Sequence, residues 1–123
     1  MEETYKKLFE EFLDGAINEE VIGRYNSAIS NYYKALTTLC SLLIYLRNRK
    51  TANSHQEVDL FMSVLFPDIR KNIDGLYKTY TSTYQILKTK KDCEEIKNGI
   101  KRVIKLGRLE KDFKEALEKI SVI

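Results

Sequence analysis

The residues of this sequence that could do chemistry are its single histidine and two groups of basic residues. His55 stands at the expected start of a helix, and each basic group stands at the expected end of another helix. The groups are Arg47, Arg49 and Lys50, and Lys88, Lys90 and Lys91. Arginine and lysine bind phosphate oxygens, and the N–H groups that open a helix also favour an anion. If the second and fourth helices run parallel, all seven residues share one end of the fold and are predicted to bind phosphate, a nucleotide or RNA.

The same basic groups also fit a structural role. Lysine and arginine in the last turn of a helix offset the negative end of its dipole without binding any ligand. His55 has two interpretations as well, because a lone histidine among basic residues could act as a general base in RNA cleavage, or simply begin a helix at the surface. The sequence favours the structural role in both cases.

Signals for an enzyme are scarce. The chain contains no glycine-rich phosphate loop and no pair of histidines at a metal-binding spacing, and most acidic residues lie opposite lysines at helical spacing. Cys40 and Cys93 are 53 residues apart and are expected to be free thiols. We therefore expect no metal and no cofactor, and the sequence favours a function other than catalysis without excluding an enzyme.

The elements that must position these residues are helices. There is one proline, there are five glycines, and no segment shows the alternation of a strand. Apolar residues recur at helical spacing over residues 3–22, 25–49, 55–66, 68–87 and from Asp92 to Gly107, and a short helix follows. Ser54 and Glu57 form a capping box for the third of these helices. The prediction is an all-α, up-and-down bundle of four to five main helices plus a short C-terminal helix, forming a single domain over residues 1–123.

The helix over 25–49 carries two apolar stripes, and each needs its own neighbours. One stripe includes Tyr32, and the second is formed by Tyr33, Thr37, Cys40 and Ile44. Such a helix is either central in its bundle or has a second face at an interface. The second stripe is therefore predicted to contact another helix, or to form a homodimer or partner interface.

Tyrosines are numerous in the expected helices. Six of them could stack on bases of single-stranded RNA, although their positions on apolar stripes favour packing in the core. They are Tyr25, Tyr32, Tyr33, Tyr77, Tyr80 and Tyr84.

Charge is distributed unevenly along the chain. Residues 1–22 carry seven acids against Lys6 and Lys7, whereas residues 23–123 carry 19 bases against 11 acids. The two parts could neutralise each other, or a basic face could remain for a polyanion. No uncharged apolar run approaches the ~20 residues that span a bilayer, and the first residues are acidic where a signal peptide would be basic. We expect a cytoplasmic protein that does not associate with membranes.

Two strings of the sequence resemble the HEPN domain family, in particular its small stand-alone archaeal and bacterial members. The first is AISNYYKALTTLCSLLIYL and the second is NSHQEVDLF, and the likeness extends over about residues 3–105. The positions that match the loose motifs of the family are Ala28, Tyr32, Tyr33, Ala35, His55, Val58, Leu60 and Phe61.

The resemblance implies a bundle of four or five helices, frequent homodimers, and roles near nucleotides and RNA. Some members of the family pair with a small nucleotidyltransferase in toxin–antitoxin systems, and others are ribonucleases with an Arg-x(4–6)-His motif. Arg49 and His55 fit that motif with five residues between them, but the family's catalytic pair usually lies later, where YKTYTSTYQ has neither residue. The expected function is therefore non-catalytic binding of a nucleotide, RNA or a nucleotidyltransferase. The alternatives are a structural homodimer or interaction module, and a ribonuclease that uses Arg49 and His55.

Overall fold

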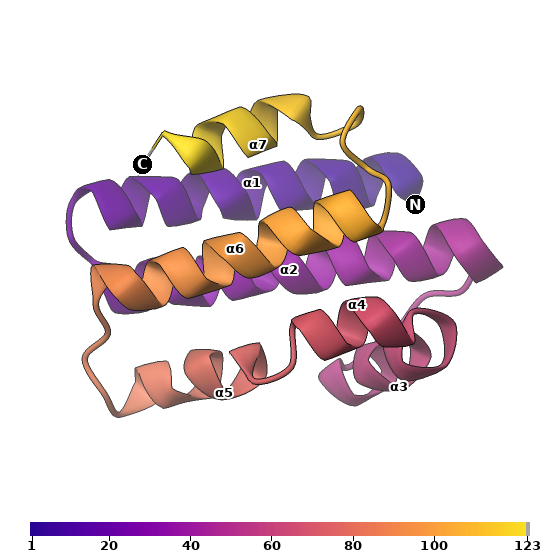
Figure 1. The fold of residues 1–123 in the computed structure, drawn as a ribbon, viewed down its shortest axis with the longest axis horizontal. Coiled ribbons are helices and arrows are strands. Elements are labelled where there is room, and N and C mark those ends of the chain that lie inside the picture. Colours follow the sequence, from indigo (N-terminus) through magenta and orange to yellow (C-terminus); the bar gives the residue numbers. More distant parts are fainter. Residues whose placement is uncertain (123) are drawn as a thin grey trace.

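The computed structural model describes residues 1–122, and in this range the chain is a bundle of helices without a strand (Figure 1). The all-α prediction is confirmed. The helices are α1 (Glu2–Val21), α2 (Tyr25–Asn48), α3 (His55–Leu65), α4 (Pro67–Asn72), α5 (Leu76–Thr81), α6 (Lys90–Leu106) and α7 (Lys114–Ser121), with a 3₁₀ turn η1 (Ser82–Tyr84) after α5. None of the described helices is both long enough and apolar enough to cross a membrane.

Helix α2 is the centre of the bundle, and it packs against α1, α3, α5 and α6. Its 24 residues span about 36 Å at 1.5 Å per residue. Both of its apolar stripes are buried, so Tyr32 is fully buried and Tyr33 is only 8% exposed. The two stripes therefore reflect a helix with neighbours on several sides, as one of the two interpretations of the sequence predicted.

The predicted helix over 68–87 is broken in the structure into α4, α5 and η1. The break falls at Gly75, whose φ of 91° lies in the left-handed region that a continuous right-handed helix excludes. After this turn, α5 approaches α6 so closely that a Cβ added to Gly99 would collide with Leu76. The apolar residues of the predicted helix are therefore divided among α4, α5, η1 and the segments between and after them.

The direction of the α4–α5 segment also differs from the prediction. Helix α3 has 11 residues and does not run the length of the bundle, and Phe66 alone separates it from α4. Consequently α4 and α5 run back toward the N-terminal end of α2. The contact that shows this is a hydrogen bond from the backbone N–H of Lys88 to Asn26 Oδ1 (2.8 Å), near the N-terminus of α2. The segment therefore runs antiparallel to α2, as Figure 1 shows.

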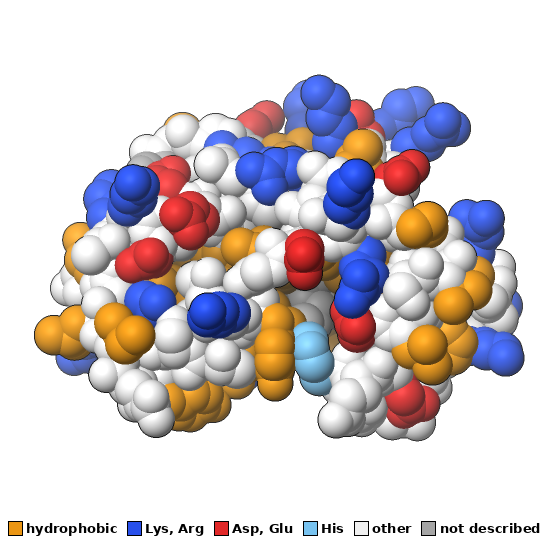
Figure 2. Space-filling model, turned by 60° about the horizontal axis from the view of Figure 1, so that its bottom comes forward, with side chains coloured by type: hydrophobic (Ala, Val, Ile, Leu, Met, Phe, Trp, Pro, Cys, Tyr) orange, Lys and Arg blue, Asp and Glu red, His pale blue; other side chains and the backbone are white. Residues whose placement is uncertain are grey.

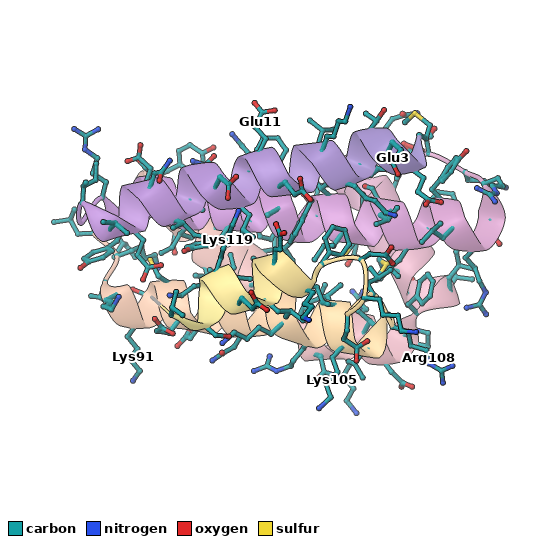
Figure 3. All side chains as sticks on the ribbon, turned by 90° about the horizontal axis from the view of Figure 1, so that it is seen from above. Glu3, Glu11, Lys91, Lys105, Arg108 and Lys119 are labelled. Atoms are coloured by element: carbon teal, nitrogen blue, oxygen red, sulfur yellow. The ribbon has the colours of Figure 1, made fainter. Side chains whose placement is uncertain are left out.

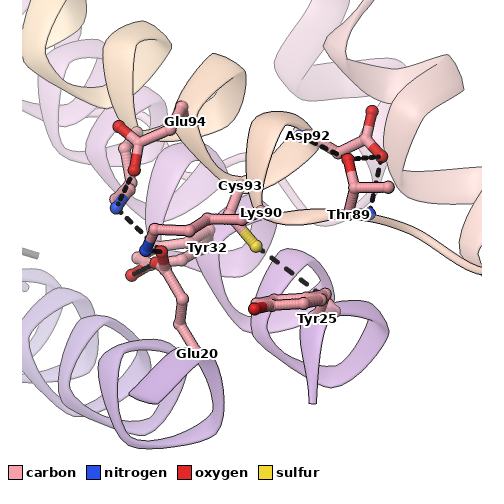
Figure 4. Close-up of polar contacts among 9 residues, drawn as sticks. Glu20, Tyr25, Tyr32, Thr89, Lys90, Asp92, Cys93 and Glu94 are labelled. Carbon is pink, nitrogen blue, oxygen red and sulfur yellow. Dashed lines mark hydrogen bonds and ion pairs between the residues drawn. The ribbon is translucent and has the colours of Figure 1, made fainter. Parts of the chain in front are cut away.

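A buried polar network joins α1, α2 and α6 near that same end (Figure 4). Glu20 accepts hydrogen bonds from Tyr32 Oη (2.7 Å), Lys97 Nζ (3.0 Å) and Lys90 Nζ (3.0 Å). Lys97 is fully buried and also pairs with Glu94 (2.8 Å). Each buried charge thus has an opposite charge beside it, which a charged group removed from water requires.

Other charges of α1 are paired with the C-terminal part of the chain. Lys119 of α7, labelled in Figure 3, pairs with Asp14 (3.1 Å), and Lys6 pairs with Asp112 (3.2 Å). Phe9 and Phe113 pack edge to face beneath these pairs, with ring centroids 4.7 Å apart. Part of the acidic character of α1 is therefore neutralised by lysines from α6 and α7.

The starts of α3 and α6 are capped by side chains. Ser54 Oγ accepts from Glu57 N, as predicted, although the Glu57 carboxylate accepts from Asn53 N and not from Ser54. Helix α6 begins earlier than predicted, because Thr89 is its N-cap and Asp92 completes the capping box.

Candidate functional site

The structure separates the two basic groups that were expected to form one site. Arg47, Arg49 and Lys50 lie at the C-terminal end of α2, whereas Lys88 is held at its N-terminal end by Asn26. Figure 3 shows Lys91 toward one end of the molecule and Arg108 toward the other. The expectation of a shared basic end is thus wrong, because α4 and α5 return antiparallel to α2.

The arginines nearest to His55 in sequence lie on aromatic rings. The Arg49 guanidinium carbon is 5.2 Å from the centroid of Tyr45, and that of Arg47 is 5.3 Å from the centroid of Phe66. Arg49 also adopts a left-handed conformation, with a φ of 57°, where α2 ends. Neither arginine lines the cavities beside His55 that are described below.

His55 is the first residue of α3, and its exposed ring is fixed by two tyrosines. Its Nδ1 is 3.2 Å from Tyr33 Oη, which gives a hydrogen bond from helix α2. Its ring stacks on Tyr77 of α5, with centroids 3.9 Å apart and an interplanar angle of 14°. Segments that are far apart in sequence thus hold one histidine ring at the surface.

The stacking continues through other tyrosines. The rings of Tyr33 and Tyr80 are parallel within 8° and 4.6 Å apart, and Tyr84 packs edge to face on Tyr80. Tyr77 and Tyr84 are 47% and 75% exposed. We call Tyr33, His55, Tyr77 and Tyr80 the aromatic cleft, because these four residues line the cavities between α2, α3 and α5.

Two cavities meet at this cleft and share five lining residues, which are Tyr33, Thr37, His55, Val58 and Tyr77. The α4-side cavity has a volume of about 250 Å³ and reaches toward α4, and the α1-side cavity has about 440 Å³ and reaches toward α1. In Figure 2 the pale blue side chain of the single histidine lies at the edge of a notch between two lobes. The ring of His55 is therefore within reach of a molecule in either cavity.

The two cavities differ in charge. Of the residues lining the α1-side cavity, only Lys34 carries a formal charge, and several hydroxyl and amide side chains accompany it. The α4-side cavity has an apolar floor that includes Leu36, Cys40 and Met62. Its charged lining residues are Asp59, Arg70 and Asp74.

Asp59 and Arg70 form a two-pronged ion pair at the edge of the α4-side cavity. Arg70 Nε donates to Asp59 Oδ1 (2.9 Å) and Arg70 Nη2 to Asp59 Oδ2 (3.2 Å). These hydrogen bonds hold the pKa of Asp59 below its usual value. Asp59 therefore stays ionised, and its charge is matched by Arg70.

Burial raises the pKa of two groups that line the α4-side cavity, Tyr33 and Cys40. It raises the pKa of the Tyr33 hydroxyl, so this group remains a neutral hydrogen-bonding partner of His55. It also raises the pKa of the Cys40 thiol to about 12. A thiol with so high a pKa is not a nucleophile near neutral pH, so Cys40 contributes an apolar surface.

The second stripe of α2 is covered within the chain. Ile44 and Cys40 are 0% and 2% exposed, and Tyr33 and Thr37 line the cavities of the cleft. The expected homodimer or partner interface on Tyr33, Thr37, Cys40 and Ile44 is corrected accordingly, because this stripe already faces neighbours in its own chain.

Sequence reasoning identified His55 but missed most of its surroundings. The apolar pattern predicts core packing for Tyr77 and Tyr80, and no motif singles out Lys34 or Asp74. The signal that could have revealed the break before Tyr77 and Tyr80 is the Asp74–Gly75 pair, a common turn dipeptide. It marks the break that turns α5 toward His55. Among residues 1–122, no group of three or more His, Cys, Asp or Glu side chains is placed to hold a metal ion.

The chain was also compared with models of protein families, with curated proteins and with solved structures, and no match was found in any of the three.

Proposed function

We propose that the aromatic cleft binds a nucleotide or a short stretch of single-stranded RNA. The observation that carries this proposal is the exposed, face-to-face stack of His55 and Tyr77 at the point where the two cavities meet. Aromatic rings that are exposed and already stacked offer a surface for one more planar group, and bases bind proteins in this way.

The polar part of the ligand is expected on the α1 side. Lys34 supplies the positive charge there, and Ser54 and His55 at the start of α3 line the same cavity. The N–H groups and the dipole of a helix N-terminus favour an anion. The base would then lie over the rings, and its phosphate would face Lys34.

The HEPN resemblance supports this function, but the proposed site differs from the basic end that the sequence predicted. Of the basic residues that were expected to bind phosphate, only His55 lies in the cleft, while Arg47 and Arg49 lie on aromatic rings outside it. We propose a non-catalytic, HEPN-like binding protein in the cytoplasm. The two free, buried cysteines suit a reducing compartment.

The test is equilibrium binding of nucleoside monophosphates and short single-stranded RNA at low salt. Tyr77→Ala should weaken binding about 5- to 150-fold, because stacking on one aromatic residue contributes about 1–3 kcal/mol per base. Leu87→Ala is the control, since Leu87 is also an exposed large apolar residue but lines neither cavity. Absence of binding at millimolar ligand, or equal effects of both variants, would refute the proposal.

Salt dependence tests the phosphate contact separately. Lys34→Ala should make the slope of log K against log salt less steep by about 0.7 for single-stranded RNA if Lys34 neutralises one phosphate. Lys91→Ala, on a lysine that lines neither cavity, should leave the slope unchanged. A slope that depends on Arg47, Arg49 and Lys50 instead would restore the original prediction of a basic end.

A ribonuclease is the second candidate, and the geometry of His55 favours it over other enzymes. Its Nδ1 is occupied by Tyr33, and Nε2 has no hydrogen-bond partner within residues 1–122, so that atom is free to exchange a proton with RNA. His55→Ala should then abolish cleavage, and Arg49→Ala should also reduce it if Arg49 takes part. Cleavage that survives His55→Ala would remove His55 from the mechanism.

A partner surface is the third candidate, and it lies on the outer face of α3. Leu60 and Val64 are one helical turn apart and are 62% and 70% exposed. We propose this face for a homodimer or for a nucleotidyltransferase partner in a toxin–antitoxin pair. Leu60→Glu with Val64→Glu should reduce the mass in solution to that of a monomer or prevent copurification of the enzyme, whereas Leu87→Glu should do neither.

A further inference from the structure

We infer that the α4-side cavity selects guanine over the other bases, with Asp74 as the specificity-determining residue. This inference rests on the proposed function and names the base that the cleft would take.

The size of the α4-side cavity limits its occupant. Its volume of about 250 Å³ lies below the roughly 300–1,000 Å³ of clefts that hold drug-sized ligands. A single base is a more suitable occupant than a whole nucleotide. Tyr33, His55 and Tyr77 provide rings at its mouth, and Leu36 and Met62 provide an apolar floor.

The charges of this cavity set the orientation of the ligand. Asp59 and Arg70 neutralise each other, and Asp74 adds an unmatched negative charge. A phosphate would be repelled there and attracted by Lys34 in the other cavity. The base is therefore expected in the α4-side cavity and the phosphate in the α1-side cavity.

Asp74 is the group available to read the base. Within residues 1–122 its carboxylate has no ion-pair or side-chain hydrogen-bond partner, whereas both oxygens of Asp59 are taken by Arg70. An ionised carboxylate only accepts hydrogen bonds, through two adjacent oxygens. Guanine presents two adjacent donors on its Watson–Crick edge, N1–H and the N2 amino group, and adenine, cytosine and uracil each present fewer.

Arg70 can complete the recognition. Its ion pair with Asp59 uses Nε and Nη2, so Nη1 has no partner among the described residues. In guanine, the O6 acceptor adjoins the N1–H and N2 donors. A donor from Arg70 could therefore bind O6 while the Asp74 carboxylate accepts from N1–H and N2. Arginine is the residue that most often binds guanine O6 in protein complexes.

The experiment compares GMP, IMP, AMP, CMP and UMP on the wild-type chain and on Asp74→Asn. Discrimination by a two-pronged contact predicts that GMP binds about 5- to 150-fold more tightly than AMP. IMP, which lacks the N2 amino group, should fall between them. Asp74→Asn should remove the preference for GMP and leave AMP binding within about twofold, because an amide has one acceptor oxygen beside a donor NH2 and so cannot accept from two adjacent donors through two atoms. Asp68→Asn, on α4 but outside both cavities, is the matched control and should keep the preference.

Two other outcomes distinguish a failure of guanine selection from a failure of the proposed function. Equal affinity for all five nucleotides, with binding still sensitive to Tyr77→Ala, would overturn guanine selection and leave the proposed function intact. Failure of every nucleotide to bind would overturn both.

Discussion

The Glu20–Lys97 network and the aromatic cleft use similar residue types at two places along α2. They differ in how deeply their polar groups are buried and in whether those groups are paired. In the network, Glu20 and Lys97 have fully buried side chains, and each is matched by an opposite charge. In the cleft, His55 and Tyr77 are exposed, and Asp74 has no ion-pair partner among the described residues. Closed, mutually satisfied groups stabilise a fold, whereas open groups with unused hydrogen bonds are available to a ligand.

The largest effect is expected from Lys97→Ala. Lys97→Ala removes one of the two lysines that pair with the buried Glu20 and leaves Lys90 as the remaining cation, and breaking a buried ion pair costs up to about 3–5 kcal/mol of unfolding free energy. Urea denaturation measures this loss, and Lys105→Ala, exposed on the same helix, should stay within about 0.5 kcal/mol of wild type. A loss below 1 kcal/mol for Lys97→Ala would show that the network does not stabilise the fold.

Tyr77→Ala should weaken ligand binding more than it lowers stability, whereas Lys97→Ala is expected to act mainly on stability. Tyr77 is half exposed, so its removal should cost no more than about 1 kcal/mol of stability while ligand binding weakens by about 1–3 kcal/mol. Measuring stability and affinity on the same preparation separates the two roles. If Tyr77→Ala unfolds the protein as readily as Lys97→Ala does, the cleft belongs to the core and the contrast between the regions fails.

Acid should weaken the network. Hydrogen bonds from Tyr32, Lys90 and Lys97 outweigh the desolvation of Glu20, and its pKa is lowered from 4.5 in the folded chain. A lowered folded-state pKa means that Glu20 contributes stability above pH 4.5, and this contribution is lost as the pH falls through its folded-state pKa. Unfolding free energy measured from pH 7 to pH 3 should fall less steeply in Glu20→Gln than in wild type, and identical slopes would contradict this assignment.

The smallest effect is expected from Tyr33→Phe. This change removes the hydrogen bond to His55 Nδ1 but keeps the ring that stacks on Tyr80. Since water can replace the lost hydroxyl at the exposed imidazole, the cost should be about 0.5–1.5 kcal/mol or less. Thermal unfolding with a parallel nucleotide titration measures it, and a tenfold loss of affinity would mean that the orientation of His55 is more important than the stacking surface.

Most of the helices can be predicted from the sequence because local signals, such as apolar periodicity and helix caps, specify them. The apolar periodicity of α2 placed it over 25–49, against Tyr25–Asn48 in the structure, and Ser54 with Glu57 placed the start of α3 at His55. The break at Gly75 was missed because the apolar series of 69–87 continues across it. One left-handed glycine outweighs that periodicity, since no continuous helix accommodates its φ.

The site was less predictable because it depends on how the helices are arranged. His55 was identified as a candidate from its residue type and its position at a helix start. The neighbours of His55 are determined by the direction of α4 and α5, which no local pattern indicates. That direction moved Lys88, Lys90 and Lys91 away from His55 and brought Tyr77 onto its ring.

The most direct test of the central claim is an NMR titration of the isotopically labelled chain with GMP. We expect the resonances of His55, Tyr77 and Asp74 to shift and saturate together, while those of Glu20 and Lys97 stay unchanged. Shifts confined to Lys88, Lys90 and Lys91, or no shifts at millimolar GMP, would contradict the assignment of the aromatic cleft as the ligand-binding site.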